Sequence, residues 1–228
     1  MKVAVIPARG GSKRIPRKNI REFCGKPMIA WPIETSQNSS LFDHIIVSTD
    51  DDEIARVAQQ YGAEVPFRRP PQLADDHTPT RPVINHALGQ IEDLYGLPNY
   101  VCTIYPTAPF LQVSDLRCGL EKIINDEADF AFSVTEFAYP IQRALRINST
   151  KRIEMVHPEY RDTRSQDLEP TYHDAGQFYW GRTTALIDGR PTVSDNSIPV
   201  LLPNWRAIDI DTEEDWFRAE LLHKTTFF

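Results

Sequence analysis

The feature that most constrains the fold of this chain is an alternation between short apolar, β-branched runs and longer amphipathic segments. The apolar runs are typical of buried strands, and the amphipathic segments of helices. Such alternation predicts a three-layer, doubly wound α/β fold with a mainly parallel sheet. In chain order we expect strands at residues 2 to 8, 43 to 50, 63 to 67, 100 to 106 and 128 to 137, and helices at residues 28 to 37 (Pro27 beside the first turn), 51 to 62, 83 to 96 and 114 to 126.

The alternation breaks between about residues 138 and 172, where the sequence is polar and rich in arginine and tyrosine. Segments such as RALRIN predict short hairpin strands, so we interpret this stretch as an excursion from the sheet. Afterwards QFYWGRTTALI predicts a strand and a helix, and residues 205 to 223 a strand running into a C-terminal helix. With 228 residues the chain is long enough to bury about 70% of its surface, and we expect one domain over residues 1 to 228.

The overall charge argues against a general nucleic-acid binder. The chain has 25 Lys and Arg against 32 Asp and Glu, a formal net charge of −7, which repels phosphate backbones. No apolar run reaches the roughly 18 residues of a membrane span, and the three cysteines lack the paired spacing of a zinc or redox site. We therefore expect a cytoplasmic protein without nucleic-acid or membrane partners.

Against this acidic background the stretch IPARGGSKRIPRKN is strongly basic, with five Lys or Arg residues from Arg9 to Lys18. It follows the first predicted strand, and ligands of such sheets lie beyond the carboxyl ends of the strands. The stretch matches neither GxGxxG nor GxxxxGK[ST]. Backbone N–H groups of Gly10, Gly11 and Ser12 nevertheless suit an anion, which predicts a polyphosphate cradle; a solvated basic loop is the alternative.

The stretch IDIDT places Asp209 and Asp211 on one face of a predicted strand, about 7 Å apart. Two such carboxylates can hold Mg²⁺ together with substrate phosphates. Alternatively, Asp211 or Thr212 caps the last helix, with Glu214 completing a capping box. A third polar region, a loop containing Arg69, could read a base and ribose or be solvated.

Together these stretches resemble the CMP-sialic acid synthetase family of cytidylyltransferases. The similarity is carried by IPARGGSKRIPRKNI, GKPMIAWPIE, VSTDDDEIA, RRPPQLADDHT, YPTAPFL and IDIDTEEDW, in family order along nearly the whole chain. REFCGKPMIAW, AEVPFRRP and DAGQFYWG look most like the pseudaminic acid branch. The resemblance implies the fold described above, a homodimer, and the Mg²⁺-dependent reaction of CTP with a nine-carbon nonulosonic acid to give a CMP-sugar, used in surface glycan or flagellin glycosylation, and pyrophosphate.

The resemblance also implies residue roles. Arg9, Lys18, Asp209 and Asp211 would be catalytic, and the last two would hold the metal. The CTP contacts would be Ala8, Arg9, Gly10, Gly11, Ser12, Lys18, Asn19, Arg69, Thr78 and Thr80.

For the sugar, the resemblance implies contacts from Tyr105, Arg143, Arg164, Gln177 and Tyr179, with both arginines in a dimerisation arm at about 138 to 172. Tyr105 stands where sialic acid enzymes carry Gln, and AGQFY replaces NGAIY, which favours pseudaminic acid over N-acetylneuraminate. N-acetylneuraminate, legionaminate and Kdo remain alternative acceptors. A non-catalytic nucleotide-sugar sensor is disfavoured because the aspartate pair is present.

Overall fold

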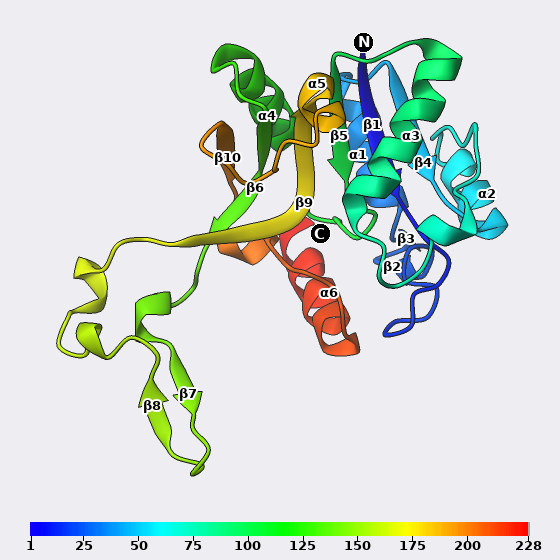
Figure 1. The fold of residues 1–228 in the computed structure, drawn as a ribbon. Coiled ribbons are helices and arrows are strands. Elements are labelled where there is room, and N and C mark those ends of the chain that lie inside the picture. The colour runs from blue at the N-terminus through cyan, green and yellow to red at the C-terminus, as the bar shows by residue number, and fades with distance from the viewer. Residues whose placement is uncertain (228) are drawn as a thin grey trace.

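The computed structural model describes residues 1–227, and its centre is a six-stranded sheet (Figure 1). The strand order is β10-β6-β9-β5-β1-β4, and β9 runs antiparallel to both of its neighbours while the other pairs are parallel. The predicted mainly parallel α/β sheet is therefore confirmed. The strand bounds are β1 (Lys2–Pro7), β4 (His44–Ser48), β5 (Tyr100–Ile104), β6 (Phe130–Glu136), β9 (Tyr172–Arg182) and β10 (Ser197–Leu201).

Helices cover both faces of the sheet, giving three layers. Alternate residues of β1 point to opposite faces: Ala4 and Ile6 join a core with one set of helices, and Val3 and Val5 join a core with the other. The first set is α1 (Ala30–Ser39), α2 (Asp52–Gln60) and α4 (Val113–Asn125), and the second is α3 (Thr80–Tyr95) and α5 (Thr183–Ile187).

A third, smaller core lies beyond the carboxyl ends of the strands, beneath α6 (Glu213–Phe227). There Trp216 packs edge-on against Phe23 of a short hairpin formed by β2 (Glu22–Phe23) and β3 (Lys26–Pro27). Pro27 thus lies in a hairpin strand, three residues before α1 begins at Ala30, and not beside the first turn of that helix. In the part of the chain that the structure describes, every helix is too short or too polar to cross a membrane.

Two predicted strands are wrong. Residues 63 to 67 form an isolated bridge between Ile46 and Glu64, because Pro66 has no N–H with which to continue a ladder. Residues 207 to 211 run as an irregular segment, although Ile208 and Ile210 are buried as predicted. The sheet edge is taken instead by β10, which pairs with β6 and tolerates Pro199 as an edge strand can; the sequence analysis missed this strand.

The predicted excursion is confirmed between the end of β6 and the start of β9. It contains a hairpin of β7 (Leu145–Ile147) and β8 (Ile153–Met155), and it projects away from the body of the molecule (Figure 1). Three 3₁₀ turns complete it: η2 (Ile141–Arg143), η3 (Pro158–Tyr160) and η4 (Ser165–Asp167). We call residues 138–171 the arm.

Candidate active site

A polar cavity of about 450 Å³ opens at the carboxyl edge of the sheet, where segments far apart in the sequence meet. We call it the polar cavity. It gathers most of the residues that the sequence analysis singled out for CTP and metal. These are Arg9, Ser12, Lys18, Asn19, Arg69, Thr78, Thr80, Asp209 and Asp211, and Tyr105 lies at its border.

The basic loop and the aspartate pair contact each other directly in this cavity. The Lys18 ammonium donates to the Ile210 carbonyl at 2.7 Å and to the Asp211 carboxylate at 3.2 Å. The Arg14 guanidinium pairs with the other Asp211 oxygen at 2.9 Å, so Arg14 has a defined partner at the site. Two regions about 190 residues apart therefore form one charged wall.

Asp211 is free for this role because another residue caps α6. Thr212 Oγ1 accepts from the Asp215 N–H at 3.2 Å, and the Asp215 carboxylate accepts from the Thr212 N–H at 2.8 Å. The capping box is thus formed by Thr212 with Asp215. Of the two alternatives for the cap, Thr212 is confirmed, whereas Glu214 does not complete the box. Beside it, burial and the charge of Asp211 raise the pKa of Asp209.

Arg9 and the loop before α3 close the opposite side. Arg9 donates to the carbonyl of Asp75 and pairs with the Asp76 carboxylate at 2.9 Å. The Asp75 carboxylate accepts from the N–H and hydroxyl of Thr78, which holds this loop in shape. Asp75 and Asp76 therefore position the basic loop.

Arg69 is almost fully buried at the base of the polar cavity. Its guanidinium donates to the hydroxyl and the carbonyl of Ser48, at the end of β4. Burial lowers the pKa of Arg69 to about 10, so the residue stays cationic at neutral pH. Asn19 is similarly buried and donates its amide to the Arg9 carbonyl at 2.9 Å.

Two predicted CTP contacts, Ala8 and Gly10, have other roles. Ala8 is fully buried and its N–H donates to the Ser48 carbonyl at 3.0 Å, so it does not reach the cavity. The Gly10 N–H is taken by the Asp50 carboxylate at 3.0 Å, and a Cβ at Gly10 would lie 2.8 Å from the Asp51 carboxylate. Glycine at position 10 thus allows close approach of an aspartate, whereas Gly11 faces open space.

Arg17 anchors the basic loop to the body. Its guanidinium forms two hydrogen bonds to Asp51, the N-cap of α2, at 2.5 and 3.0 Å, and pairs with Glu53 at 2.6 Å. The hydrogen bond from Arg17 is the main cause that lowers the pKa of Asp51 to about 2. Lys13 pairs with Asp76 at 2.5 Å.

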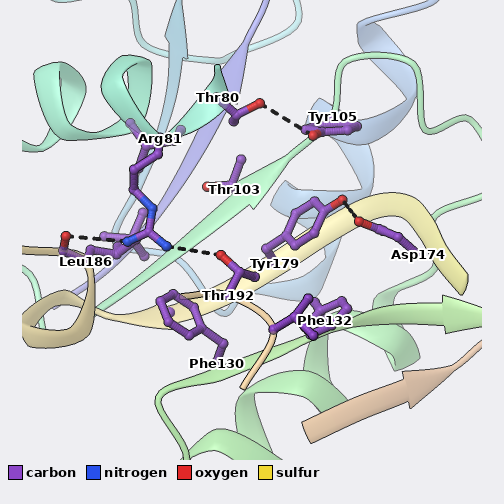
Figure 2. Close-up of a pocket in the computed structure, with 14 residues that line it drawn as sticks. Thr80, Arg81, Thr103, Tyr105, Phe130, Phe132, Asp174, Tyr179, Leu186 and Thr192 are labelled. Atoms are coloured by element: carbon purple, nitrogen blue, oxygen red, sulfur yellow. Dashed lines mark hydrogen bonds between the residues drawn. The ribbon is translucent and has the colours of Figure 1, made fainter. Parts of the chain in front are cut away.

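A second cavity of about 250 Å³ lies next to the polar cavity, between the sheet and helices α3 and α5 (Figure 2). We call it the apolar cavity. Thr80 and Tyr105 border both cavities. Tyr179 donates its hydroxyl to Asp174 at 2.5 Å, and burial is the main cause that raises its pKa. Two predicted sugar residues, Tyr105 and Tyr179, therefore line one pocket; its apolar walls include Ile84, Val101, Phe130, Phe132, Leu186 and Val193.

A bulge in β9 moves Gln177 out of this cavity. Phe132 pairs with Tyr179 but Val134 pairs with Asp174, so five residues of β9 span two of β6. Gly176 has a φ of +62° within the bulge. Gln177 is buried and its amide donates to the Arg206 carbonyl, so the predicted sugar contact of Gln177 does not fit the structure. The same bulge presents Asp174, which sequence reasoning missed.

Arg143 and Arg164 lie on the arm. Arg143 donates to the Ser165 hydroxyl at 2.9 Å and Arg164 pairs with Asp167 at 2.8 Å. Neither lines the two cavities described above, so their predicted sugar contacts are not made within one chain of the structure.

A mainly parallel sheet with a basic loop and an aspartate pair facing each other at its carboxyl edge defines a nucleotide-dependent transferase. Residues 3–223 match the cytidylyltransferase family, and the chain belongs to that family.

The chain is similar to several curated relatives. It is 42% identical to the pseudaminic acid cytidylyltransferase of Campylobacter jejuni, over 97% of this chain and 96% of the relative. It is 35% identical to the CMP-N,N'-diacetyllegionaminic acid synthase of Legionella pneumophila, over 96% and 95% of the two chains. A solved structure of CMP:2-keto-3-deoxy-manno-octonic acid synthetase complexed with CTP shares the fold, with a TM-score of 0.73 and 16% identity over 98% of both chains.

Proposed function

We propose that this cytidylyltransferase joins CTP and pseudaminic acid to give CMP-pseudaminic acid and pyrophosphate. The observation that carries the proposal is the single polar cavity in which the basic loop faces Asp209 and Asp211. The similarity to the Campylobacter jejuni relative over nearly the whole of both chains supports the acceptor.

In this reaction an acceptor hydroxyl oxygen bonds to the α-phosphorus of CTP while the bond from that phosphorus to the β-phosphate bridge oxygen breaks. The hydroxyl proton leaves to solvent, and pyrophosphate carries away the negative charge. Arg9 and Lys18 neutralise that charge as it builds. Both are already held in the wall of the cavity, Arg9 by Asp76 and Lys18 by Asp211, so their positions are set before CTP arrives.

The donor set fits Mg²⁺. Asp209 and Asp211 supply two carboxylates in one cavity, and partial desolvation together with the charge of Asp211 raises the pKa of Asp209, a crowding of negative charge that a cation would relieve. Magnesium is usually held by one or two carboxylates together with substrate phosphates and water. When bound, it would supply charge neutralisation at the α-phosphate and activation of the attacking hydroxyl. Arg14 and Lys18 already balance Asp211.

The acceptor would extend into the apolar cavity. Tyr105 and Thr80 border both cavities, so a sugar whose reacting hydroxyl lies near CTP can reach the pocket beside Tyr179. Its apolar floor suits methyl and acyl substituents, and the Asp174 carboxylate suits their amide N–H groups.

We further propose that two copies pair through the arm. Apolar side chains of the β7–β8 hairpin are exposed, Ile147 by 75% and Ile153 by 72%, and they oppose each other across the strands. A two-stranded hairpin is marginally stable alone, so a second copy covering this face would stabilise it and could bring Arg143 and Arg164 to the partner's acceptor. Sedimentation should show a dimer that Ile147→Asp with Ile153→Asp dissociates; an unchanged dimer would contradict this interface.

The acceptor is tested by offering CTP and Mg²⁺ with pseudaminic, legionaminic or N-acetylneuraminic acid and measuring pyrophosphate release. We expect the highest kcat/KM with pseudaminic acid. A preference for either other acid would overturn the acceptor assignment but keep the transferase, whereas no release with any acid would overturn both. A parallel reaction with EDTA should be silent and should recover when Mg²⁺ is restored.

A further inference from the structure

Arg81 closes one side of the apolar cavity, and the sequence analysis gave it no role. It lies in the first turn of α3, directly after Thr80, and its side chain is half-buried. Figure 2 shows the guanidinium reaching from α3 across to the chain that follows α5. The residue therefore joins two elements that approach the cavity from opposite sides.

The guanidinium contacts three acceptors on the far side. It donates to the carbonyls of Leu186 at 3.5 Å and Arg190 at 2.9 Å, and to the Thr192 hydroxyl at 3.0 Å. Its central carbon lies 5.2 Å from the ring centre of Phe130, on the cavity floor. We call residues 186–193 the connector. Arg81 thus fixes the connector relative to the floor by hydrogen bonds and by a cation–π contact.

Local structure alone does not favour an arginine at this position. The N-terminal turn of a helix repels cations because its N–H groups carry partial positive charge, and α3 has no acidic residue in that turn to compensate. Burial also lowers the pKa of Arg81, which reflects the cost of removing the charge from water. The connector compensates this cost, because its carbonyl and hydroxyl groups accept hydrogen bonds from Arg81. A residue that positions another segment has such contacts.

The connector forms part of the wall of the apolar cavity. Leu186 is buried against the floor, whereas Thr192 and the largely exposed Val193 lie where the cavity opens. On its outer side, Arg190 ties the connector to Asp129 at 2.8 Å, and it also pairs at 2.8 Å with Asp188 within the connector. The inner side of the connector is held by Arg81, so Arg81 sets the distance between the wall and the floor.

We infer that Arg81 is a positioning residue that determines acceptor specificity, by holding the connector as the wall of a narrow apolar pocket for acylamino and methyl substituents. The inference rests on the proposed function, because it takes the apolar cavity as the acceptor site. Loss of the guanidinium releases the wall, weakens acceptor binding and admits acids of other shapes. CTP binding is unaffected, because neither Arg81 nor the connector lines the polar cavity.

The test uses Arg81→Lys and Arg81→Ala in the full chain, with steady-state kinetics for CTP and for the three acids. Lysine keeps the charge, but its compact ammonium lacks the planar fork with which the two guanidinium nitrogens reach the three acceptors. We expect the KM for the preferred acid to rise at least about tenfold and its preference over the other acids to shrink, since pocket contacts discriminate by such factors. The KM for CTP should stay unchanged, and added ethylguanidinium should lower the acceptor KM of Arg81→Ala again.

Two variants separate positioning from general structure. Thr192→Val removes one acceptor, and combined with Arg81→Lys it should add little, because both act through the same contact. Arg190→Gln removes the ion pairs on the outer side of the connector but keeps the Arg190 carbonyl that accepts from Arg81. It should lower thermal stability and leave the acceptor preference unchanged, because Arg81 still holds the inner side. An unchanged acceptor KM in both Arg81 variants, or equal rises for CTP and acceptor, would overturn the inference. Lack of turnover by the wild-type protein with every acid would instead overturn the proposed function.

Discussion

The two cavities that meet at Tyr105 are built from different kinds of interaction. The polar cavity is walled by paired charges, with Asp211 between Lys18 and Arg14, and Arg9 on Asp76. The apolar cavity is walled by rings and branched side chains, with hydrogen bonds from Tyr179 to Asp174 and from Arg81 to Thr192 at its rim.

This difference separates two tasks. Charges at a rigid edge can hold and neutralise a polyphosphate that every cytidylyltransferase shares. A packed apolar pocket discriminates by shape, because each methyl group that fits or fails to fit changes binding. We therefore expect changes in the polar cavity to affect turnover with any acceptor, and changes in the apolar cavity to affect the choice of acceptor.

The largest effect is expected from Asp211→Asn. The substitution keeps the shape of the side chain but removes the charge that Lys18 and Arg14 balance and that Mg²⁺ would bind. We expect kcat/KM to fall by at least about 10³-fold with every acid, since such electrostatic contacts are worth several kcal/mol in the transition state. Pyrophosphate release measures it.

The matched control is Glu214→Gln, an exposed acid three residues later in the first turn of α6, which should leave turnover unchanged. Circular dichroism should show that both variants are folded. Turnover by Asp211→Asn near the wild-type rate would break the assignment of the polar cavity as the reaction site.

A pH experiment tests how firmly the basic loop is held. The pKa of Asp51 is lowered to about 2 in the folded protein by Arg17. An aspartate with a lowered pKa stabilises the fold above its unfolded pKa near 3.9, and that stability is lost as pH falls towards 2. Between pH 5 and 2, the free energy of unfolding of the wild type should fall by about 2 kcal/mol more than that of Asp51→Asn.

Asparagine keeps the N-cap of α2 and removes the ion pair, so urea unfolding at several pH values isolates the charge. Arg17→Met should likewise reduce the fall in the free energy of unfolding between pH 5 and 2. Parallel pH profiles in wild type and variants would show that the loop is not anchored by this pair.

Tyr179→Phe tests the apolar cavity. It removes the hydroxyl that donates to Asp174 and leaves the ring that stacks on Phe132. We expect the acceptor KM to rise about tenfold, the equivalent of one lost hydrogen bond, with the KM for CTP unchanged. Tyr100→Phe, on β5 outside the cavity, is the control and should change neither. Equal rises in the KM for CTP and the KM for the acceptor would contradict separate binding of the two substrates in the two cavities.

The smallest effect is expected from Thr212→Ala. Loss of the N-cap of α6 should lower the free energy of unfolding by about 1 kcal/mol, measured by urea denaturation. Because Thr212 leaves Asp211 free for the polar cavity, the acceptor preference should not change. No loss from Thr212→Ala, together with a loss from Asp211→Ala, would restore Asp211 as the cap.

The sequence predicted the site residues best where they lie in short contiguous motifs. The basic loop, the IDIDT aspartates and the loop with Arg69 all line one cavity, as strand order and the carboxyl-edge rule predict. The predictions were wrong where the structure of a segment depends on which strand it pairs with. The strand expected at 207 to 211 does not form, because β10 occupies the edge beside β6. Gln177 was assigned to the sugar pocket together with Tyr179, and the β9 bulge separates them.

By itself, the sequence determined the α/β class, the positions of most strands and helices, and the charged residues of the nucleotide edge. These follow from local periodicity and from the fact that parallel strands end at one edge. The tertiary structure alone decided that Asp211 pairs with Lys18, that Asp174 faces Tyr179, and that Arg81 holds the connector. Those contacts join residues on separate elements, and their geometry depends on bulges and edges that no local pattern specifies.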